Sequence, residues 1–307
     1  MTVFTSRPYA GDEDLQAMID LVSRRPVQRI GDFPTILDLR QILGRAGEWQ
    51  NVHLWWDADG RLAGFAIFID YVSKLYFEIA LGTVSVEVAV QINGWGEERA
   101  RQIVGKADEP VVLRASCHDD HAERIALLEQ LGFVRQEQYT LHFARSLGDP
   151  IPEPQVPAGF GVRHVAGEHE ADALAALHRA AFGTQNMTVE GRLSWMRTPE
   201  YDPELDLVAV APDGTLAAYV FCSISEEENA LSGRNDGYTD PVATHPAYQR
   251  CGLARALLLT GFHLLKQRGV ETAHTSTGSW NVAMRRTARS VGYRAESKTI
   301  FFEKQIR

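Results

Sequence analysis

The chain has 307 residues, 45% of them hydrophobic, and a formal net charge of −9 at pH 7. This length favours two domains, and the ordinary composition allows each of them to bury a core. The acidic balance argues against a general nucleic-acid or anionic-membrane binder, because such partners need a basic surface.

The first half of the chain predicts strands alternating with helices. Residues 7–14 read as a short strand followed by a helix with an acidic first turn, and residues 60–68 as a turn followed by a strand. Residues 118–121, His-Asp-Asp-His, are typical of a metal-ligand cluster or of residues that cap a helix, and capping is the commoner case. A Leu-Gly-Phe-Val-Arg segment at 131–135 stands near the end of this half.

A proline-rich segment divides the chain. Residues 149–157 contain four prolines. Proline has no backbone N–H and does not continue a helix, so we interpret this segment as a linker. We therefore expect one domain over residues 1–148 and another over residues 158–307.

The second half repeats the plan of the first. Three segments match in the same order, residues 163–170 with 7–14, 214–222 with 60–68, and 291–294 with 131–135. Three ordered matches indicate a tandem duplication with inserted loops. Each half reads as a strand, helices, a strand meander, a long helix, a strand, a helix and final strands, which predicts an α/β fold with a mixed sheet.

The most informative segment of the second half joins a strand to a long helix. An apolar, β-branched run over residues 237–244 ends at His245, and an amphipathic helix is predicted over residues 252–268 after a short turn. The first N–H groups of a helix have no intrahelical partner, so this turn is a predicted anion site. It lacks the Gly-Lys-Ser/Thr of nucleotide-triphosphate loops and the three glycines of dinucleotide folds, which indicates a pyrophosphate within another cofactor.

The turn resembles a motif of a known family. Residues 249–254, Gln-Arg-Cys-Gly-Leu-Ala, are similar to the Gln/Arg-x-x-Gly-x-Gly/Ala motif of the GCN5-related N-acetyltransferases (GNAT), which binds the pyrophosphate of coenzyme A. Asn281 and Gly292-Tyr293 follow at distances similar to those of the family's Asn-x-x-Ala and Gly-Phe pattern. The resemblance, strongest to the tandem, mycothiol synthase-like members, implies two GNAT-like domains. Each would have a mixed, mostly antiparallel, splayed sheet flanked by helices.

The resemblance also implies acetyl-coenzyme A as the co-substrate. In the family, the strand before the turn pairs with the pantetheine arm and one of its N–H groups polarises the acyl carbonyl, while the asparagine meets the arm or its neighbouring backbone. The implied cofactor-binding residues are Val242, Ala243, Thr244, Gln249, Arg250, Cys251, Gly252, Leu253, Ala254 and Asn281. At the equivalent place, residues 82–98, the first half lacks the motif and has Glu97 and Glu98 in the following helix, which would repel phosphate. We therefore expect the cofactor in the second half alone.

Two side chains of the incoming strand are candidate catalytic residues. Tyr238 and Asp240 are two positions apart, so we expect them on one face, toward the acyl centre. Asp240 can take the proton of an acceptor amine, directly or through water, or it can close the turn before Pro241. Many family members place a tyrosine that protonates the leaving thiolate at the position of Ala288, where the first half has Leu128, so no acid comes from this position.

We expect an N-acetyltransferase that passes the acetyl group directly from the thioester to an amine of a small molecule or peptide. The alternative is a non-catalytic acyl-coenzyme A-binding or regulatory protein of the same fold, favoured by Ala288 and by the unequal halves. The three glutamates at 226–228 can guide a cationic acceptor or form a solvated hairpin end.

The cysteines and apolar runs predict a cytoplasmic protein. Cys117, Cys222 and Cys251 form neither a disulfide framework nor a paired metal spacing, which suits a reducing compartment. No apolar run reaches membrane-spanning length and no signal-peptide core is visible. We expect no metal, no nucleic-acid or membrane partner, and a monomer or homodimer.

Overall fold

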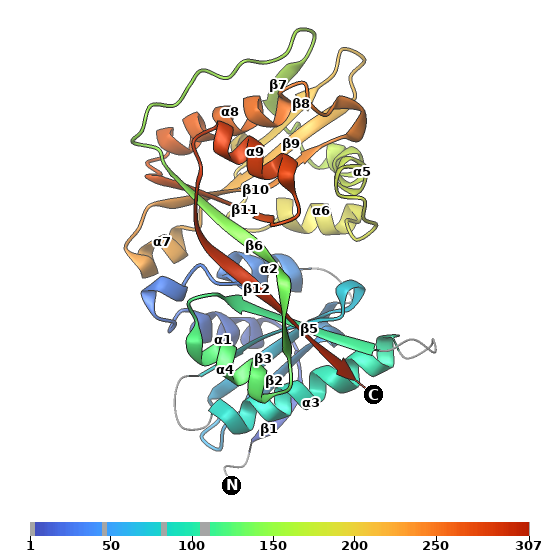
Figure 1. The fold of residues 1–307 in the computed structure, drawn as a ribbon, viewed down its shortest axis with the longest axis vertical. Coiled ribbons are helices and arrows are strands. Elements are labelled where there is room, and N and C mark those ends of the chain that lie inside the picture. Colours follow the sequence, from blue (N-terminus) through green and yellow to red (C-terminus); the bar gives the residue numbers. More distant parts are fainter. Residues whose placement is uncertain (1–3, 45–47, 81–84, 105–110, 307) are drawn as a thin grey trace. The chain divides into compact units, whose positions relative to one another are not determined.

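The computed structural model describes residues 4–44, 48–80, 85–104 and 111–306, which form two compact units. Unit 1 consists of Met1–Tyr139 and Lys298–Arg307, and unit 2 of Thr140–Ser297. In Figure 1 each unit is built around a sheet with helices on both faces.

Unit 1 contains a mixed sheet in the order β1-β2-β3-β4-β5-β12. Neighbouring strands are antiparallel except β4 and β5, which are parallel. The strands are β1 (Thr5–Pro8), β2 (Val52–Trp56), β3 (Leu62–Ile69), β4 (Lys74–Ile79), β5 (Val111–His118) and most of β12 (Arg294–Ile306). The helices are α1 (Asp12–Val22), α2 (Ile36–Leu43), α3 (Ser85–Val104) and α4 (Ala122–Gln130).

The alternation of side chains along β3 explains why unit 1 has helices on both faces. Phe65 and Ile67 are buried with residues of α1 and α2, whereas Ala66 and Phe68 are buried with residues of α3 and α4. Successive side chains of a strand point to opposite faces, so a strand that is apolar at every position needs cover on both.

Unit 2 contains a sheet in the order β6-β11-β10-β9-β8-β7, in which only β10 and β11 are parallel. Its strands are β7 (Gly161–His164), β8 (Asp206–Val210), β9 (Leu216–Ser223), β10 (Asp236–Thr244), β11 (Thr272–Gly278) and the second part of β6 (Val134–Ser146). Its helices are α5 (Ala171–Phe182), α6 (Val189–Met196), α7 (Glu226–Ser232), α8 (Leu253–Gln267) and α9 (Val282–Ser290).

The buried strand β9 separates the two helical layers of unit 2. Tyr219 and Phe221 pack in one cluster with residues of α5 and α6. On the other face, Gly261 of α8 lies so close to Cys222 that an added Cβ would be 2.8 Å from the sulfur atom. Glycine at this position therefore allows α8 to pack directly against the sheet.

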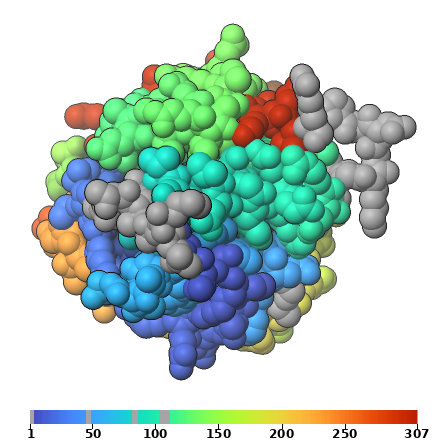
Figure 2. All heavy atoms as spheres, turned by 90° about the horizontal axis from the view of Figure 1, so that it is seen from below, coloured from blue at the N-terminus to red at the C-terminus, as the bar shows by residue number. Residues whose placement is uncertain are grey.

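Each half of the chain contributes one long strand to the sheet of the other half. Residues 140–146 of β6 pair with β11 of unit 2, and residues 299–306 of β12 pair with β5 of unit 1. Figure 2 shows the red C-terminal segment between the green and teal residues of unit 1. The compact units thus differ from the expected ranges 1–148 and 158–307 at these two strands, because each sheet receives a strand from the other half.

Several predicted elements have the expected type. The strand predicted over 237–244 is β10, and the helix predicted over 252–268 is α8. The expected hairpin end at 226–228 is wrong. These glutamates form the first turn of α7, where Ser225 caps the helix and acidic side chains suit its dipole.

The described residues contain no helix that is long and apolar enough to cross a membrane. The same residues contain no group of three or more His, Cys, Asp or Glu side chains arranged to hold a metal ion. This includes His118, the last residue of β5, and His121, the N-cap residue of α4, whose side chain makes no capping bond.

Candidate functional site

The parallel strands β10 and β11 pair only near their beginnings. The ladder joins residues 236–238 to 272–274 and extends no further in the described part of the chain. Beyond it, β10 continues beside β9 through a β-bulge between Thr239 and Val242. Residues 242–244 therefore have an edge without a ladder partner on the β11 side, and an extended ligand can pair with such an edge.

Asp240 spans the point at which the two strands separate. Its Oδ1 accepts a hydrogen bond from the Thr275 hydroxyl at 2.8 Å, and its Oδ2 accepts one from the Ser276 N–H at 2.9 Å. These bonds replace ladder hydrogen bonds between β10 and β11. Burial raises the pKa of Asp240 to about 7, although the bonds from Thr275 and Ser276 favour the charged form.

The β-bulge changes the expected relation between Tyr238 and Asp240. Tyr238 lies beside His274, with the ring centroids 5.5 Å apart. The next side chain, Thr239, is buried and its hydroxyl is 2.8 Å from that of Tyr293. Since the bulge interrupts simple alternation after Thr239, the Asp240 carboxyl is directed across the strand toward β11.

His274 and Asp236 form a second pair of polar side chains near the point at which β10 and β11 separate, which we call the fork. The Nε2 atom of His274 is 3.4 Å from Oδ2 of Asp236. Neither residue belongs to the family motif, and the sequence analysis missed both. No local signal could have found them, because they meet through strand register, which places His274 opposite Tyr238.

The turn after β10 leads into a helix start without a side-chain cap. Arg250 and Gly252 have left-handed backbones, with φ of 63° and 93°, and Gly252 is the N-cap of α8 without a capping side chain. The N–H groups of residues 253–255 lie before the first intrahelical hydrogen bond, which Ala256 makes to Gly252. A Cβ added at Gly252 would meet no atom within 4 Å, so the space beside this backbone is open.

The charge around this helix start is positive. The first turn of α8 has no acidic residue, and neither Arg250 nor Arg255 forms an ion pair with any residue that the structure describes. The first turn of α9 also lacks acidic residues. Helix dipole and arginine charge therefore favour an anion at the same place.

The other implied cofactor residues have clear local roles. Asn281 is the N-cap of α9, and its Oδ1 accepts the N–H of Met284 at 3.0 Å. The thiol of Cys251 donates to the carbonyl of Tyr248 at 2.7 Å and so braces the turn. Leu253 is buried in the core, so only its backbone N–H can serve a ligand. Gln249 is exposed and extended.

The position of the family's tyrosine acid lies inside the core. Ala288 and Leu128, its counterpart in the first half, have no exposed surface. The nearby Tyr293 is also buried, and its hydroxyl donates to the carbonyl of His274 at 3.2 Å. Burial raises the pKa of Tyr293 far above its ordinary value, so this phenol stays protonated and holds β11 in place.

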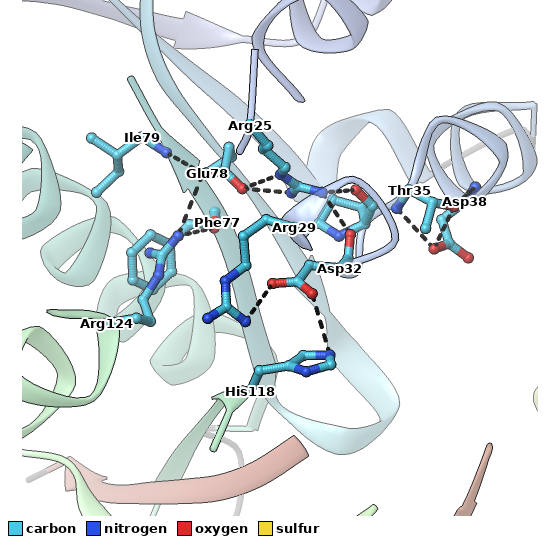
Figure 3. A network of polar contacts seen from close by, with 11 residues as sticks. Arg25, Arg29, Asp32, Thr35, Asp38, Phe77, Glu78, Ile79, His118 and Arg124 are labelled. Atoms are coloured by element: carbon cyan, nitrogen blue, oxygen red, sulfur yellow. Dashed lines mark hydrogen bonds and ion pairs between the residues drawn. The ribbon is translucent and has the colours of Figure 1, made fainter. Parts of the chain in front are cut away.

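Charged side chains fill the corresponding place in unit 1 (Figure 3). There β4 and β5 pair in parallel at Lys74 and Arg114, near the start of β4. Arg124 of α4 donates to the carbonyl of Phe77 at 3.1 Å and lies 3.6 Å from Glu78. The backbone edge of β4 that an extended ligand would need is thus bonded to an arginine.

The ion pairs extend from β4 to the segment between α1 and α2. Arg25 contacts Glu78 at 2.5 Å, and Asp32 is 3.3 Å from His118 (Figure 3). Burial alone would raise the pKa of Glu78, but Arg25 and Arg124 outweigh it and lower that pKa. Glu78 is therefore a stable carboxylate between two arginines.

One expectation about unit 1 is wrong. α3 begins at Ser85, and Glu97 lies three turns along it, about 18 Å from the helix start. Its carboxylate is 2.7 Å from Lys304, so Glu97 and Glu98 do not face an anion at the helix N-terminus. Residues 82–84, at the start of the segment compared with the motif, lie outside the described residues.

Comparison with known sequences finds the acetyltransferase (GNAT) family over residues 171–293. A mycothiol acetyltransferase of Salinispora arenicola (strain CNS-205) is 30% identical over 219 residues, which cover 69% of this chain and 67% of the relative. Another, of Nocardia farcinica (strain IFM 10152), is 28% identical over 256 residues and 78% of each chain.

Comparison with solved structures finds the same fold over the whole chain. A tandem GNAT protein from the clavulanic acid biosynthesis pathway has a TM-score of 0.68 at 15% identity, covering 99% of this chain and 98% of that one. A GCN5-related N-acetyltransferase from Sphaerobacter thermophilus has a TM-score of 0.68 at 22% identity, covering 99% and 96%. The predicted fold, two tandem GNAT-like domains with mixed sheets, is confirmed.

Proposed function

The chain belongs to the acetyltransferase (GNAT) family and is an N-acetyltransferase, and on this premise we propose that unit 2 binds acetyl-coenzyme A at the turn before α8 and acetylates a small-molecule amine. The observation that carries the proposal is the uncapped start of α8 directly after a strand with an unpaired edge. The mycothiol acetyltransferase relatives favour a small-molecule acceptor over a peptide.

We assign the pyrophosphate to the N–H groups of residues 249–254, with Arg250 supplying charge. The pantetheine arm would run along the free edge of residues 242–244 as an added strand. The Oδ1 atom of Asn281 is used in capping α9, so the side-chain amide would donate to the arm through Nδ2. The N–H of Gln249 also bonds the carbonyl of Pro246, at 3.4 Å, so the other N–H groups of the turn and the charge of Arg250 carry this assignment.

Asp240 would act as the general base. An ammonium acceptor must lose a proton before its nitrogen attacks the thioester carbon, and a carboxyl with a pKa of about 7 accepts that proton at neutral pH. The C–S bond then breaks and the thiolate leaves. A thiol pKa of about 8.5, by analogy with cysteine, makes the thiolate a good leaving group, so the missing tyrosine at Ala288 does not prevent the reaction. Tyr238, beside this centre, would line the acyl pocket.

The relatives are acetyltransferases, so a non-catalytic acyl-coenzyme A-binding role is not favoured. Titration calorimetry with acetyl-coenzyme A, followed by thiol release over a panel of small amines, tests the proposal. We expect one binding site per chain and thiol release with at least one amine. Failure to bind would refute the cofactor assignment, and binding without thiol release from any amine would support the non-catalytic role.

A further inference from the structure

His274 occupies the position at which the fork opens. It is the last β11 residue paired with β10, and the strands separate directly after it. Its side chain is 24% exposed, whereas Asp236 beside it is 10% exposed, so the imidazole has a limited path to solvent. The Tyr293 hydroxyl binds the carbonyl of His274 and fixes its backbone.

Asp236 is held in place as a partner for this ring. The side chain of Asn229 bonds both the N–H and the carbonyl of Asp236, at 3.0 and 2.9 Å. Arg234 lies 3.3 Å from the same carboxylate oxygen that faces His274. The Nε2 atom of His274 is buried, has no hydrogen-bond partner among the described residues and faces that oxygen at 3.4 Å. A small movement would make the bond that fixes the ring tautomer.

Asp240 lies close to His274 along β11, because its carboxylate is bonded to Thr275 and Ser276, the two residues that follow His274. The charge of a protonated His274 opposes the effect of burial and lowers the pKa of Asp240. The titratable and charged groups around the two residues are Asp236, Tyr238 and Arg234 near the imidazole, and Tyr293 and Cys222 near the carboxyl. On the other side of β11, β6 places the uncharged Ala144 opposite His274 and the titratable His142 opposite Ser276.

We propose that His274, braced by Asp236, is the proton-relay residue of the acetyl-transfer site. The acceptor amine gives its proton to Asp240, and Asp240 passes it, directly or through water, to the ring nitrogen that does not face Asp236. The imidazolium then releases the proton to solvent, and Asp240 returns to its carboxylate form. The relay rests on the proposed function of unit 2, and it explains how a buried base is reset after each turnover.

The test compares thiol-release rates between pH 5.5 and 9 for the full chain and for His274→Gln, Asp236→Asn and Asp240→Asn, with His164→Gln on the exposed strand β7 as the control. We expect His274→Gln to lower kcat by about 10²-fold, at the lower end of general acid–base effects, and to move the acid limb of the profile to higher pH. Acetyl-coenzyme A affinity and thermal stability should stay near wild type. Asp236→Asn should act in the same direction but less strongly.

Added imidazole provides the decisive readout. We expect it to restore turnover in His274→Ala and to leave Asp240→Asn unchanged, because it replaces the relay and not the base. Wild-type kinetics of His274→Gln while Asp240→Asn is inactive would overturn the relay and leave the proposed function intact. A uniform loss at every pH without imidazole rescue would also overturn it, since that is the signature of a structural role. A wild-type chain that releases no thiol would instead refute the proposed function.

Discussion

At the scale of single residues, Asp240 combines a structural and a chemical role. Each of its carboxylate oxygens accepts one hydrogen bond from β11, which holds the separated strands in register. Each oxygen also has a second lone pair, so these bonds leave acceptor capacity for an amine proton. The carboxylate thus holds β11 instead of closing the turn before Pro241, as one reading of the sequence had it, and its role as a base stays a prediction.

We expect Asp240→Asn to lower kcat/KM more at neutral pH than at high pH. The wild-type rate should rise with pH through about 7 as Asp240 loses its proton. At high pH the acceptor amine is already deprotonated and needs the base less. A thiol-release profile checks this, and an equal loss at every pH would argue against a base role.

The stability of the folded chain should show the same titration. The pKa of Asp240 is raised in the folded state, so its carboxylate is disfavoured there. Asp240 therefore makes its full contribution to the free energy of unfolding below its unfolded pKa of about 4, and this contribution is lost as the pH rises to about 7. Urea unfolding should show that the stability of Asp240→Asn relative to wild type is higher at pH 8 than at pH 5. A difference that does not change with pH would contradict the burial of the charge.

Gly252 offers a test of the cofactor turn by two matched variants. Gly252→Glu and Gly252→Gln both place a side chain on a backbone with a φ of 93°, at a similar cost of about 1–2 kcal/mol. Only the first adds a negative charge where we place the pyrophosphate. We expect calorimetry to show that Gly252→Glu abolishes acetyl-coenzyme A binding and that Gly252→Gln retains measurable affinity. Equal affinities would place the cofactor elsewhere.

At the scale of elements, α7 and α8 of the same unit begin in opposite ways. α7 has a serine cap and three glutamates in its first turn, which satisfy its N–H groups and its dipole. α8 has neither a capping side chain nor an acidic residue. A buried, apolar helix of 15 residues that lacks both depends on tertiary packing, and its N-terminus is left for an external anion.

Two variants of Asn281 distinguish its effect on the stability of α9 from its effect on ligand binding. Asn281→Ala should cost about 1 kcal/mol of unfolding free energy, because α9 loses its cap. Asn281→Asp should keep the cap, since aspartate caps as well as asparagine, and should weaken acetyl-coenzyme A binding by removing the amide donor. Thermal unfolding and calorimetry measure the two effects. Unchanged affinity in Asn281→Asp would restrict Asn281 to capping.

At the scale of the whole molecule, the duplication has produced two units that differ in the groups placed where their two parallel strands separate. In unit 2 the edge of residues 242–244 has no ladder partner on the β11 side among the described residues, whereas in unit 1 Arg124 bonds the carbonyl of Phe77 and pairs with Glu78. This contrast supports the expectation of a single cofactor site per chain. It arises from one helix position, since Arg124 follows His121 as Met284 follows Asn281.

The exchange of β6 and β12 predicts which fragments of the chain fold by themselves. Residues 158–307 lack the β6 segment that pairs with β11 at seven positions, so we expect this fragment to aggregate through the open edge. Residues 140–297 contain all of unit 2, and we expect them to unfold cooperatively and to bind acetyl-coenzyme A. Size-exclusion chromatography and calorimetry of the two fragments check this. A monomeric, binding-competent 158–307 fragment would show that the exchange is dispensable.

Features that depend on neighbouring residues could be predicted without the structure. The strand expected over 237–244 and the helix expected over 252–268 could be predicted because the signals for an apolar run and an amphipathic helix are local. The same holds for the absence of a tyrosine at Ala288 and for the duplication.

The groups that meet across the sheet could not be predicted in this way. The bonds of Asp240 to Thr275 and Ser276, and the approach of Asp236 to His274, join residues 35 to 38 positions apart. The exchange of β6 and β12 joins residues more than 100 positions apart. Such contacts follow from strand register, from a one-residue bulge and from the order of strands in the sheet. A sequence read one segment at a time carries no measure of these, because many pairings of apolar strands satisfy the same local pattern.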